Sequence, residues 1–174
     1  MIRQLKGENL KWKIEENIFQ LESESRKKEV ASIIVARLKD LDKFIIDKIS
    51  EGNVETSKIL VLYAIIKTDR LFFEFMNEVY KEKLLLRDLF LKDKDFNTFF
   101  QNKREQSKKV ASWTETTFKK LKQVYVRILF EGGLIENQKG ERSIKTPILE
   151  GEVKKYLYKI GDKIYINAII GDSE

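Results

Sequence analysis

Basic side chains that could bind phosphate are concentrated in one segment of this 174-residue chain. Between residues 103 and 127, eight lysines and arginines stand against two carboxylates, Glu105 and Glu115. This excess of six positive charges equals the net charge of the whole chain, so the rest of the sequence is neutral in sum. The eight are Lys103, Arg104, Lys108, Lys109, Lys119, Lys120, Lys122 and Arg127. Because each such contact with a nucleic-acid phosphate releases condensed counterions, the segment predicts nucleic-acid binding that weakens as salt rises.

The spacing within this segment predicts a helix over Ser112–Glu131 with one apolar and one basic face. Ser112 and Glu115 have the spacing of a capping box, and two glycines follow the predicted helix end. At about 100° per residue, the positions opposite the apolar stripe are Lys119, Lys120, Gln123 and Arg127, with Lys122 on the flank. Hydrogen bonds to phosphates or base edges could come from Thr114, Thr116, Thr117 and Gln123.

A possible wing follows this helix. Residues 136–146 are polar, centre on Gly140 and could form a short hairpin. A capped helix followed by such a hairpin resembles the recognition helix and wing of winged-helix proteins, whose helix-turn-helix relatives insert the second helix into a groove. Residues 151–158 predict a further helix, and the β-branched and aromatic run Lys163–Ile170 predicts a strand. We therefore expect a winged-helix-like part at residues 111–174, packed on a helical core.

The helical core is expected at residues 1–110. Apolar spacing predicts helices over residues 10–21, 26–50, 56–67, 71–86 and 93–100. The charged stretch 101–109 is interpreted as a solvated helix end or a loop. Hydrophobic residues make up 42% of the chain, enough to bury a core. The expected fold is mainly α, a compact helical bundle with a winged-helix-like C-terminal part and a short β element.

The residue types of this chain exclude several kinds of chemistry. It contains no cysteine and no histidine, which removes the usual zinc ligands and the Ser-His-Asp and Cys-His nucleophilic sites. The acidic pairs Asp40/Asp42 and Asp93/Asp95 are interpreted as helix caps. Glu150, Glu152 and Lys154 are of the types found in metal-dependent nucleases, but their segment is predicted to be helical. We expect no catalytic residues, metal, cofactor or small-molecule substrate.

No membrane segment is expected. The longest apolar run, residues 59–66, is far shorter than the roughly 20 residues that cross a bilayer. The first residues lack the apolar stretch of a signal peptide. The predicted location is therefore the cytoplasm.

Each of these features also has a purely structural interpretation. A basic helix face is often only a solvated surface. A second basic patch, Arg26, Lys27 and Lys28, lies near a predicted helix start, where the helix dipole disfavours cations. Trp12 and Trp113 could stack on bases, but packing in a core or interface is the favoured interpretation.

Three stretches of the sequence resemble a known family. They are LVLYAIIKTDRLFFEFMNEVYKEKLLLRDLFL, DFNTFFQNK and WTETTFKKLKQVYVRILFEGGLI. In pattern and order they look like the BrxA family of the BREX (bacteriophage exclusion) phage-defence systems, over roughly residues 10–149. The resemblance implies an all-helical core similar to the antitermination factor NusB, and an accessory role in defence with affinity for double-stranded DNA.

Three functions remain open from the sequence. The first is a non-enzymatic accessory protein that contacts double-stranded DNA mainly through phosphates. The second is an interaction module that docks other BREX proteins. The third is an RNA-binding protein resembling an antitermination factor.

Overall fold

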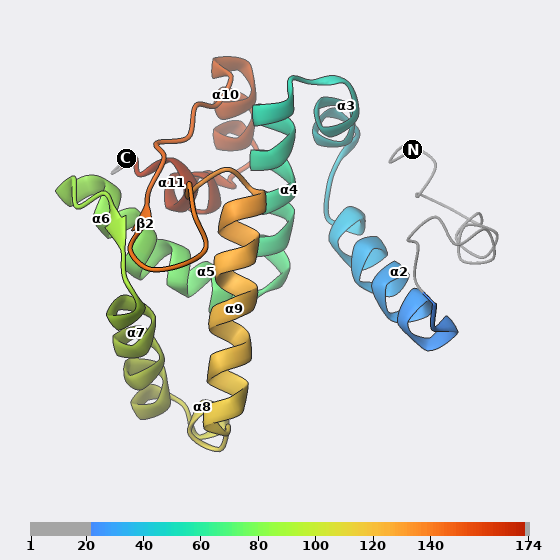
Figure 1. The fold of residues 1–174 in the computed structure, drawn as a ribbon. Helices are drawn as coiled ribbons and strands as arrows, with labels where there is room; N and C mark the ends of the chain where they lie inside the picture. The colour runs from blue at the N-terminus through green and yellow to red at the C-terminus, as the bar shows by residue number, and fades with distance from the viewer. Residues whose placement is uncertain (1–21, 173–174) are drawn as a thin grey trace. The chain divides into compact units, whose positions relative to one another are not determined.

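A computed structural model describes residues 22–172 (Figure 1). The described residues divide into two compact units at residues 68/69, and the boundary predicted at residues 110/111 falls inside the second. The described residues are mainly helical with one small antiparallel sheet, which confirms the predicted fold class at that level. The helix predicted at residues 10–21 lies outside the described residues, as does Trp12.

In the first unit, two helices replace the single one predicted over residues 26–50. Helix α2 spans Glu24–Lys39 and α3 spans Lys43–Glu51. The prediction was wrong because the Asp42 side chain accepts a hydrogen bond from the Ile45 amide at 3.0 Å and so caps a new helix. The expectation that Asp42 acts as a cap is confirmed.

Helix α4, Val54–Thr68, is the predicted buried helix, and α2 and α3 both pack against it. All eight residues of the apolar run 59–66 are buried except Val61. A helix that is apolar nearly all round is typical of burial on most sides. Within the described residues, no helix combines the length and the apolar character needed to cross a membrane.

The second unit begins with one continuous helical rod that the sequence predicted as a single helix. It consists of α5 (Arg70–Phe75), the π-helical turn η2 (Met76–Tyr80) and α6 (Lys81–Leu86). Phe72 and Phe75 are fully buried and meet rings from later helices; the centroid of Phe75 lies 4.8 Å from that of Phe96. The rod ends at Arg87, which adopts the left-handed conformation with φ 56°.

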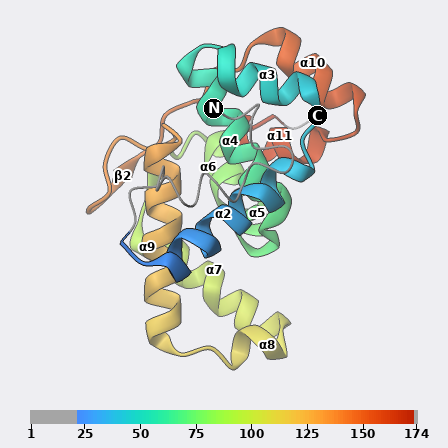
Figure 2. The ribbon, with the colours of Figure 1, turned by 90° about the vertical axis from the view of Figure 1, so that its right-hand side faces the viewer.

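Three helices follow at one end of this unit. Helix α7 spans Asp93–Gln106, the short α8 spans Lys108–Ala111, and α9 spans Glu115–Glu131. Both views place α8 where the ends of α7 and α9 meet (Figures 1 and 2). The stretch predicted as a solvated end or loop is therefore largely helical.

The start of α9 was predicted two residues too early. Thr114 caps α9, because its hydroxyl accepts a hydrogen bond from the Thr117 amide at 3.3 Å. Ser112, the predicted cap, instead donates to the Lys109 carbonyl at 2.8 Å at the end of α8. Ser112 thus lies at the end of α8, and Thr114 caps the start of α9.

A small sheet joins distant parts of this unit. Strand β1 (Phe90–Leu91), which the sequence did not predict, pairs antiparallel with β2 (Arg142–Ser143). An antiparallel bridge between Ile135 and Ile144 closes the segment after α9 into a minimal hairpin at the predicted place. The loop between Ile135 and Ile144 therefore lies beside the start of α7.

The predicted strand at Lys163–Ile170 is wrong, because this segment forms helix α11. Residues Ile166–Ile169 are all buried, and α11 packs on η2, α6 and α10 (Gly151–Lys159). A short apolar run does not distinguish a buried strand from a buried helix by periodicity alone. Gly171 ends α11 with φ 72°, and a Cβ there would lie 2.7 Å from that of Leu84.

Candidate nucleic-acid interface

Helix α9 buries most of its apolar residues on one side as predicted, but Val124 and Phe130 are 50% and 40% exposed. Phe118, Tyr125 and Leu129 are buried. The opposite side, here called the outer face of α9, is exposed and consists of Thr116, Lys119, Lys120, Gln123 and Arg127. Four of these five residues follow the helical repeat in a single row: Thr116, Lys120, Gln123 and Arg127.

The cations of the basic segment differ in whether a carboxylate neutralises them. Lys108, Lys109, Lys119 and Lys120 are exposed, and none of these four has an ion-pair partner among residues 22–172. Arg127 pairs with Glu131 at 2.8 Å, but both side chains are well exposed. Such a surface pair contributes little free energy, so Arg127 can exchange Glu131 for another anion.

Lys103 does not belong to this exposed surface. It is only 6% exposed, and its ammonium lies 2.6 Å from Glu78 and 3.0 Å from Glu74. Burial lowers the Lys103 pKa, but the hydrogen bonds to Glu78 and Glu74 outweigh it and raise the pKa overall. The predicted nucleic-acid role of Lys103 is therefore corrected to an internal one, holding α7 against α5 and η2.

Two more cations pair across the groove between α7 and α9. Arg104 lies 2.7 Å from Glu115 and stacks over the Phe118 ring at 4.6 Å. Lys122 lies 3.0 Å from Asp93 at the start of α7. Together with Lys119 they line a hollow of about 390 Å³. The groove is cationic, but two of its three charges are already matched by carboxylates.

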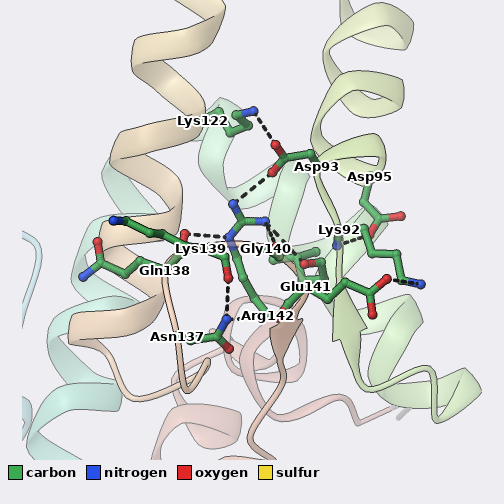
Figure 3. A network of polar contacts seen from close by, with 11 residues as sticks. Lys92, Asp93, Asp95, Lys122, Asn137, Gln138, Lys139, Gly140, Glu141 and Arg142 are labelled. Carbon is green, nitrogen blue, oxygen red and sulfur yellow. Dashed lines mark hydrogen bonds and ion pairs between the residues drawn. The ribbon is translucent and has the colours of Figure 1, made fainter.

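Asp93 also holds Arg142, which sequence reasoning missed (Figure 3). Arg142 is buried and lies 2.9 Å from Asp93. Its guanidinium donates to the Gln138 carbonyl at 3.2 Å and to the Gly140 carbonyl at 3.0 Å. Because it lies outside the basic segment, only the long-range pairing of β1 with β2 reveals this anchor for the loop.

The loop itself is closed by side-chain contacts. The Asn137 amide donates to the carbonyls of Lys139 and Glu141 at 2.6 and 3.0 Å, and Glu141 pairs with Lys92 at 2.7 Å. Gly140 has φ 68°, a conformation that favours glycine at the loop tip. Lys139 is exposed at this tip.

The surroundings of Asp93 keep its carboxyl group ionised. The hydrogen bond from Lys122 lowers the Asp93 pKa, burial raises it, and the hydrogen bond from Arg142 lowers it again, so the pKa falls below its usual value. Asp93 is therefore a carboxylate at neutral pH, and it joins α9, the start of α7 and the loop.

Comparison with known proteins identifies the family. The family model described as BrxA matches residues 4–161, which is most of the chain. The chain belongs to the BrxA family. It is 57% identical over 159 residues to the BREX protein BrxA of Bacillus cereus (strain H3081.97), covering 91% of this chain and 80% of that one. The predicted family is confirmed.

A more distant BrxA protein and one solved structure also align with most of this chain. The BREX protein BrxA of Paramagnetospirillum magneticum (strain ATCC 700264 / AMB-1) is 25% identical over 154 residues, covering 88% of this chain and 77% of that one. The crystal structure of an uncharacterized protein from Magnetospirillum magneticum superposes with a TM-score of 0.76 at 23% identity. That alignment covers 97% of this chain and 88% of the other, and it establishes a shared fold.

The second basic patch of this BrxA-family chain is largely neutralised. Lys27 is buried and pairs with Glu24 at 2.5 Å, and Arg26 pairs with Glu29 at 2.8 Å. Lys28 is exposed. The patch lies in the first unit and presents one unmatched cation, so it is a weaker candidate than α9.

Proposed function

We propose that this BrxA-family protein is a non-enzymatic, cytoplasmic, DNA-binding component of a BREX anti-phage defence system. The observation that carries the proposal is the pair Lys119 and Lys120, both exposed and without a carboxylate partner in the described part of the chain. Gln123 and Arg127 extend the same face toward the C-terminal end of α9. Lysines and arginines in one row suit the regularly spaced phosphates of a duplex.

The order of elements supports a winged-helix mode of binding. Strand β1, helix α7, the short α8, helix α9 and the Ile135–Ile144 hairpin come in the order strand, helices and wing of that fold. In this mode α9 enters the major groove, which is wide enough for a helix. Lys139 at the loop tip and Lys108 and Lys109 on α8 then reach flanking phosphates.

The proposed contacts carry little sequence information. Lysine side chains that bind phosphate position a protein on DNA without reading bases. On the outer face of α9, Gln123 is the one amide side chain that could read a base edge. We therefore expect binding to be broad in sequence and strongly dependent on salt.

The test is binding to a labelled duplex of about 30 base pairs across a salt series, with and without structured RNA as competitor. The charge reversal Lys119→Glu/Lys120→Glu is expected to abolish binding near physiological salt. Lys155→Glu/Lys159→Glu, at two exposed lysines of α10, is the matched control because it changes the net charge equally. Equal losses of duplex affinity in both variants, or no duplex binding at low salt, would contradict the proposal. If structured RNA displaces the labelled duplex but unlabelled duplex does not, RNA is favoured as the ligand.

A second candidate function, docking of other BREX proteins, is favoured by one surface feature. Leu85, Leu86, Leu89 and Phe90 are all exposed within six consecutive residues, and Leu86 is 70% exposed. Concentrated exposed apolar side chains are typical of protein interaction sites. Leu86→Glu is expected to abolish co-purification with co-expressed BREX proteins while DNA binding persists. The control is Ile148→Glu, at a side chain that is 77% exposed elsewhere in the same unit; loss with both variants, or with neither, would argue against this surface.

A further inference from the structure

A cavity of about 500 Å³ lies beside α8, between α5 and the end of α7. It shares no lining residue with the hollow between α7 and α9. Its volume falls within the range of small-molecule sites, about 300–1,000 Å³. Its lining combines apolar surface from Leu71, Val110 and Trp113 with cationic and amide side chains.

One wall of the cavity is a fixed set of ion pairs. Glu74 lies 2.8 Å from Arg70 and 3.0 Å from Lys103, and Lys103 also contacts Glu78 in the π-helical turn. Burial raises the Glu74 pKa, but the hydrogen bonds from Arg70 and Lys103 lower it further, so the pKa lies below its usual value. Each carboxylate oxygen of Glu74 thus faces a cation, which weakens the repulsion of an anion in the cavity. Turns of π-helix are frequent beside functional sites.

The remaining polar groups of the lining are mainly donors. The Gln106 side-chain oxygen accepts from Lys103 at 3.3 Å, which leaves its NH₂ group to donate. The Ser107 hydroxyl oxygen accepts from the Val110 amide at 3.4 Å, and its proton is available. Lys109 is exposed and has no ion-pair partner among the described residues. A matching ligand must therefore be rich in acceptors and negatively charged.

The apolar part of the lining requires a ligand larger than a bare anion. Trp113 is half-buried and contributes aromatic surface, with Leu71 and Val110 beside it. Planar bases stack on aromatic side chains without regard to sequence, because every base has a π face. A phosphate group bound to a flat heterocycle satisfies both halves of the cavity.

We propose that this cavity binds a nucleoside phosphate. The base packs against Trp113 and the apolar wall, and the phosphates lie between Lys109 and the exposed guanidinium of Arg70. The same chemistry is offered by a free nucleotide and by a nucleotide within single-stranded nucleic acid. This inference can be tested apart from the duplex-binding proposal, because the two share only Lys109, and Lys119 and Lys120 do not line the cavity.

The test uses tryptophan fluorescence of the full chain. The chain has two tryptophans, so Trp12→Phe leaves Trp113 as the sole reporter. Titrations use ATP, adenosine, tripolyphosphate and a short oligo(dT). We expect saturable quenching by ATP and much weaker responses to adenosine and tripolyphosphate, since each lacks one half of the ligand. If oligo(dT) quenches the fluorescence at lower concentrations than ATP does, the natural ligand is a nucleotide within single-stranded nucleic acid. If ATP quenches and oligo(dT) does not, the ligand is a free nucleotide.

Variants assign the effect to the cavity. Lys109→Ala and Arg70→Ala, at exposed side chains, should each weaken ATP binding roughly tenfold, the loss expected for one hydrogen bond to a charged group. Lys119→Ala/Lys120→Ala should leave it unchanged, whatever its effect on duplex binding. The proposal is overturned by the absence of saturable quenching, by tripolyphosphate binding as tightly as ATP, or by ATP affinity that depends on Lys119 and Lys120 instead of Lys109 and Arg70.

Discussion

Two groups of cations from the same stretch of sequence have different surroundings. The outer group, Lys108, Lys109, Lys119 and Lys120, is exposed and unpaired within the described chain. The inner group, Lys103, Arg104 and Lys122, is matched by carboxylates from other elements. A count of charges along the sequence therefore overstates the binding surface, because part of the charge holds the helices together.

The comparison gives the inner group a structural role and the outer group a binding role. Glu74, Glu78 and Asp93 are far from their partners in sequence, but the helix packing brings them within 2.6–3.0 Å. A buried cation with two carboxylates is costly to break from one side, because the remaining charges lose their partner. The outer lysines have no such constraint.

The largest effect is expected from Lys103→Met. This change leaves Glu74 and Glu78 without their shared cation, and we expect the free energy of unfolding to fall by about 2 kcal/mol, below the usual cost of breaking a fully buried pair because Glu78 is partly solvated. Urea denaturation measures it. Lys109→Met is the matched control and should have little effect on stability. Equal stability losses would remove the distinction between the two groups.

Local signals predicted much of this fold. Apolar spacing located α4 and the two faces of α9. Asp42 was correctly predicted to cap a helix, although the break between α2 and α3 that it marks was not. What failed depends on distant partners. The helix at Lys163–Ile170 is stabilised by packing on η2 and α6, which overrides its strand-like composition.

The candidate site divides in the same way. Helix periodicity alone placed Lys119 and Lys120 opposite the apolar face of α9, and the structure shows that both are exposed. The burial of Lys103 depends on the close approach of α7 to α5 and η2, and the anchor Arg142 depends on pairing between β1 and β2. Neither long-range contact leaves a local pattern in the sequence.

The inner side of α9 offers a smaller effect of opposite sign. The Tyr125 hydroxyl is buried and has no hydrogen-bond partner in the described structure, among the rings of Phe72, Phe75 and Phe100. An unsatisfied buried polar group is destabilising, so Tyr125→Phe should raise the free energy of unfolding by about 1 kcal/mol. Thermal or urea unfolding checks this. A loss of stability would mean that the hydroxyl has a role this structure does not explain.

The smallest expected effect comes from Asp93→Asn, which moves Lys122 from the inner to the outer group. Lys122 is partly exposed, and the buried Arg142 loses its carboxylate but keeps its hydrogen bonds to the Gln138 and Gly140 carbonyls, so the loss of stability should stay at about 1 kcal/mol. The salt dependence of duplex binding should steepen by up to about one phosphate contact. Unchanged salt dependence would show that Lys122 cannot reach DNA even when released.

The same variant has a defined pH signature. Because the Asp93 pKa is lowered in the folded state, its contribution to stability is present above the pKa of the unfolded chain and is lost as pH falls through the folded pKa. Stability of the native chain should therefore drop more steeply than that of Asp93→Asn below about pH 4. Parallel pH profiles would argue against a paired Asp93.

The central claim, that the outer cations bind DNA and the inner ones do not, is tested most directly by two salt slopes. Duplex affinity is measured against salt concentration for Lys119→Ala/Lys120→Ala and for Arg104→Ala/Lys122→Ala. The first variant should reduce the log–log slope by about 1.8, the value for two phosphate contacts. The second should leave the slope of the unmodified protein unchanged. Equal reductions, or a reduction only in the second variant, would contradict the account.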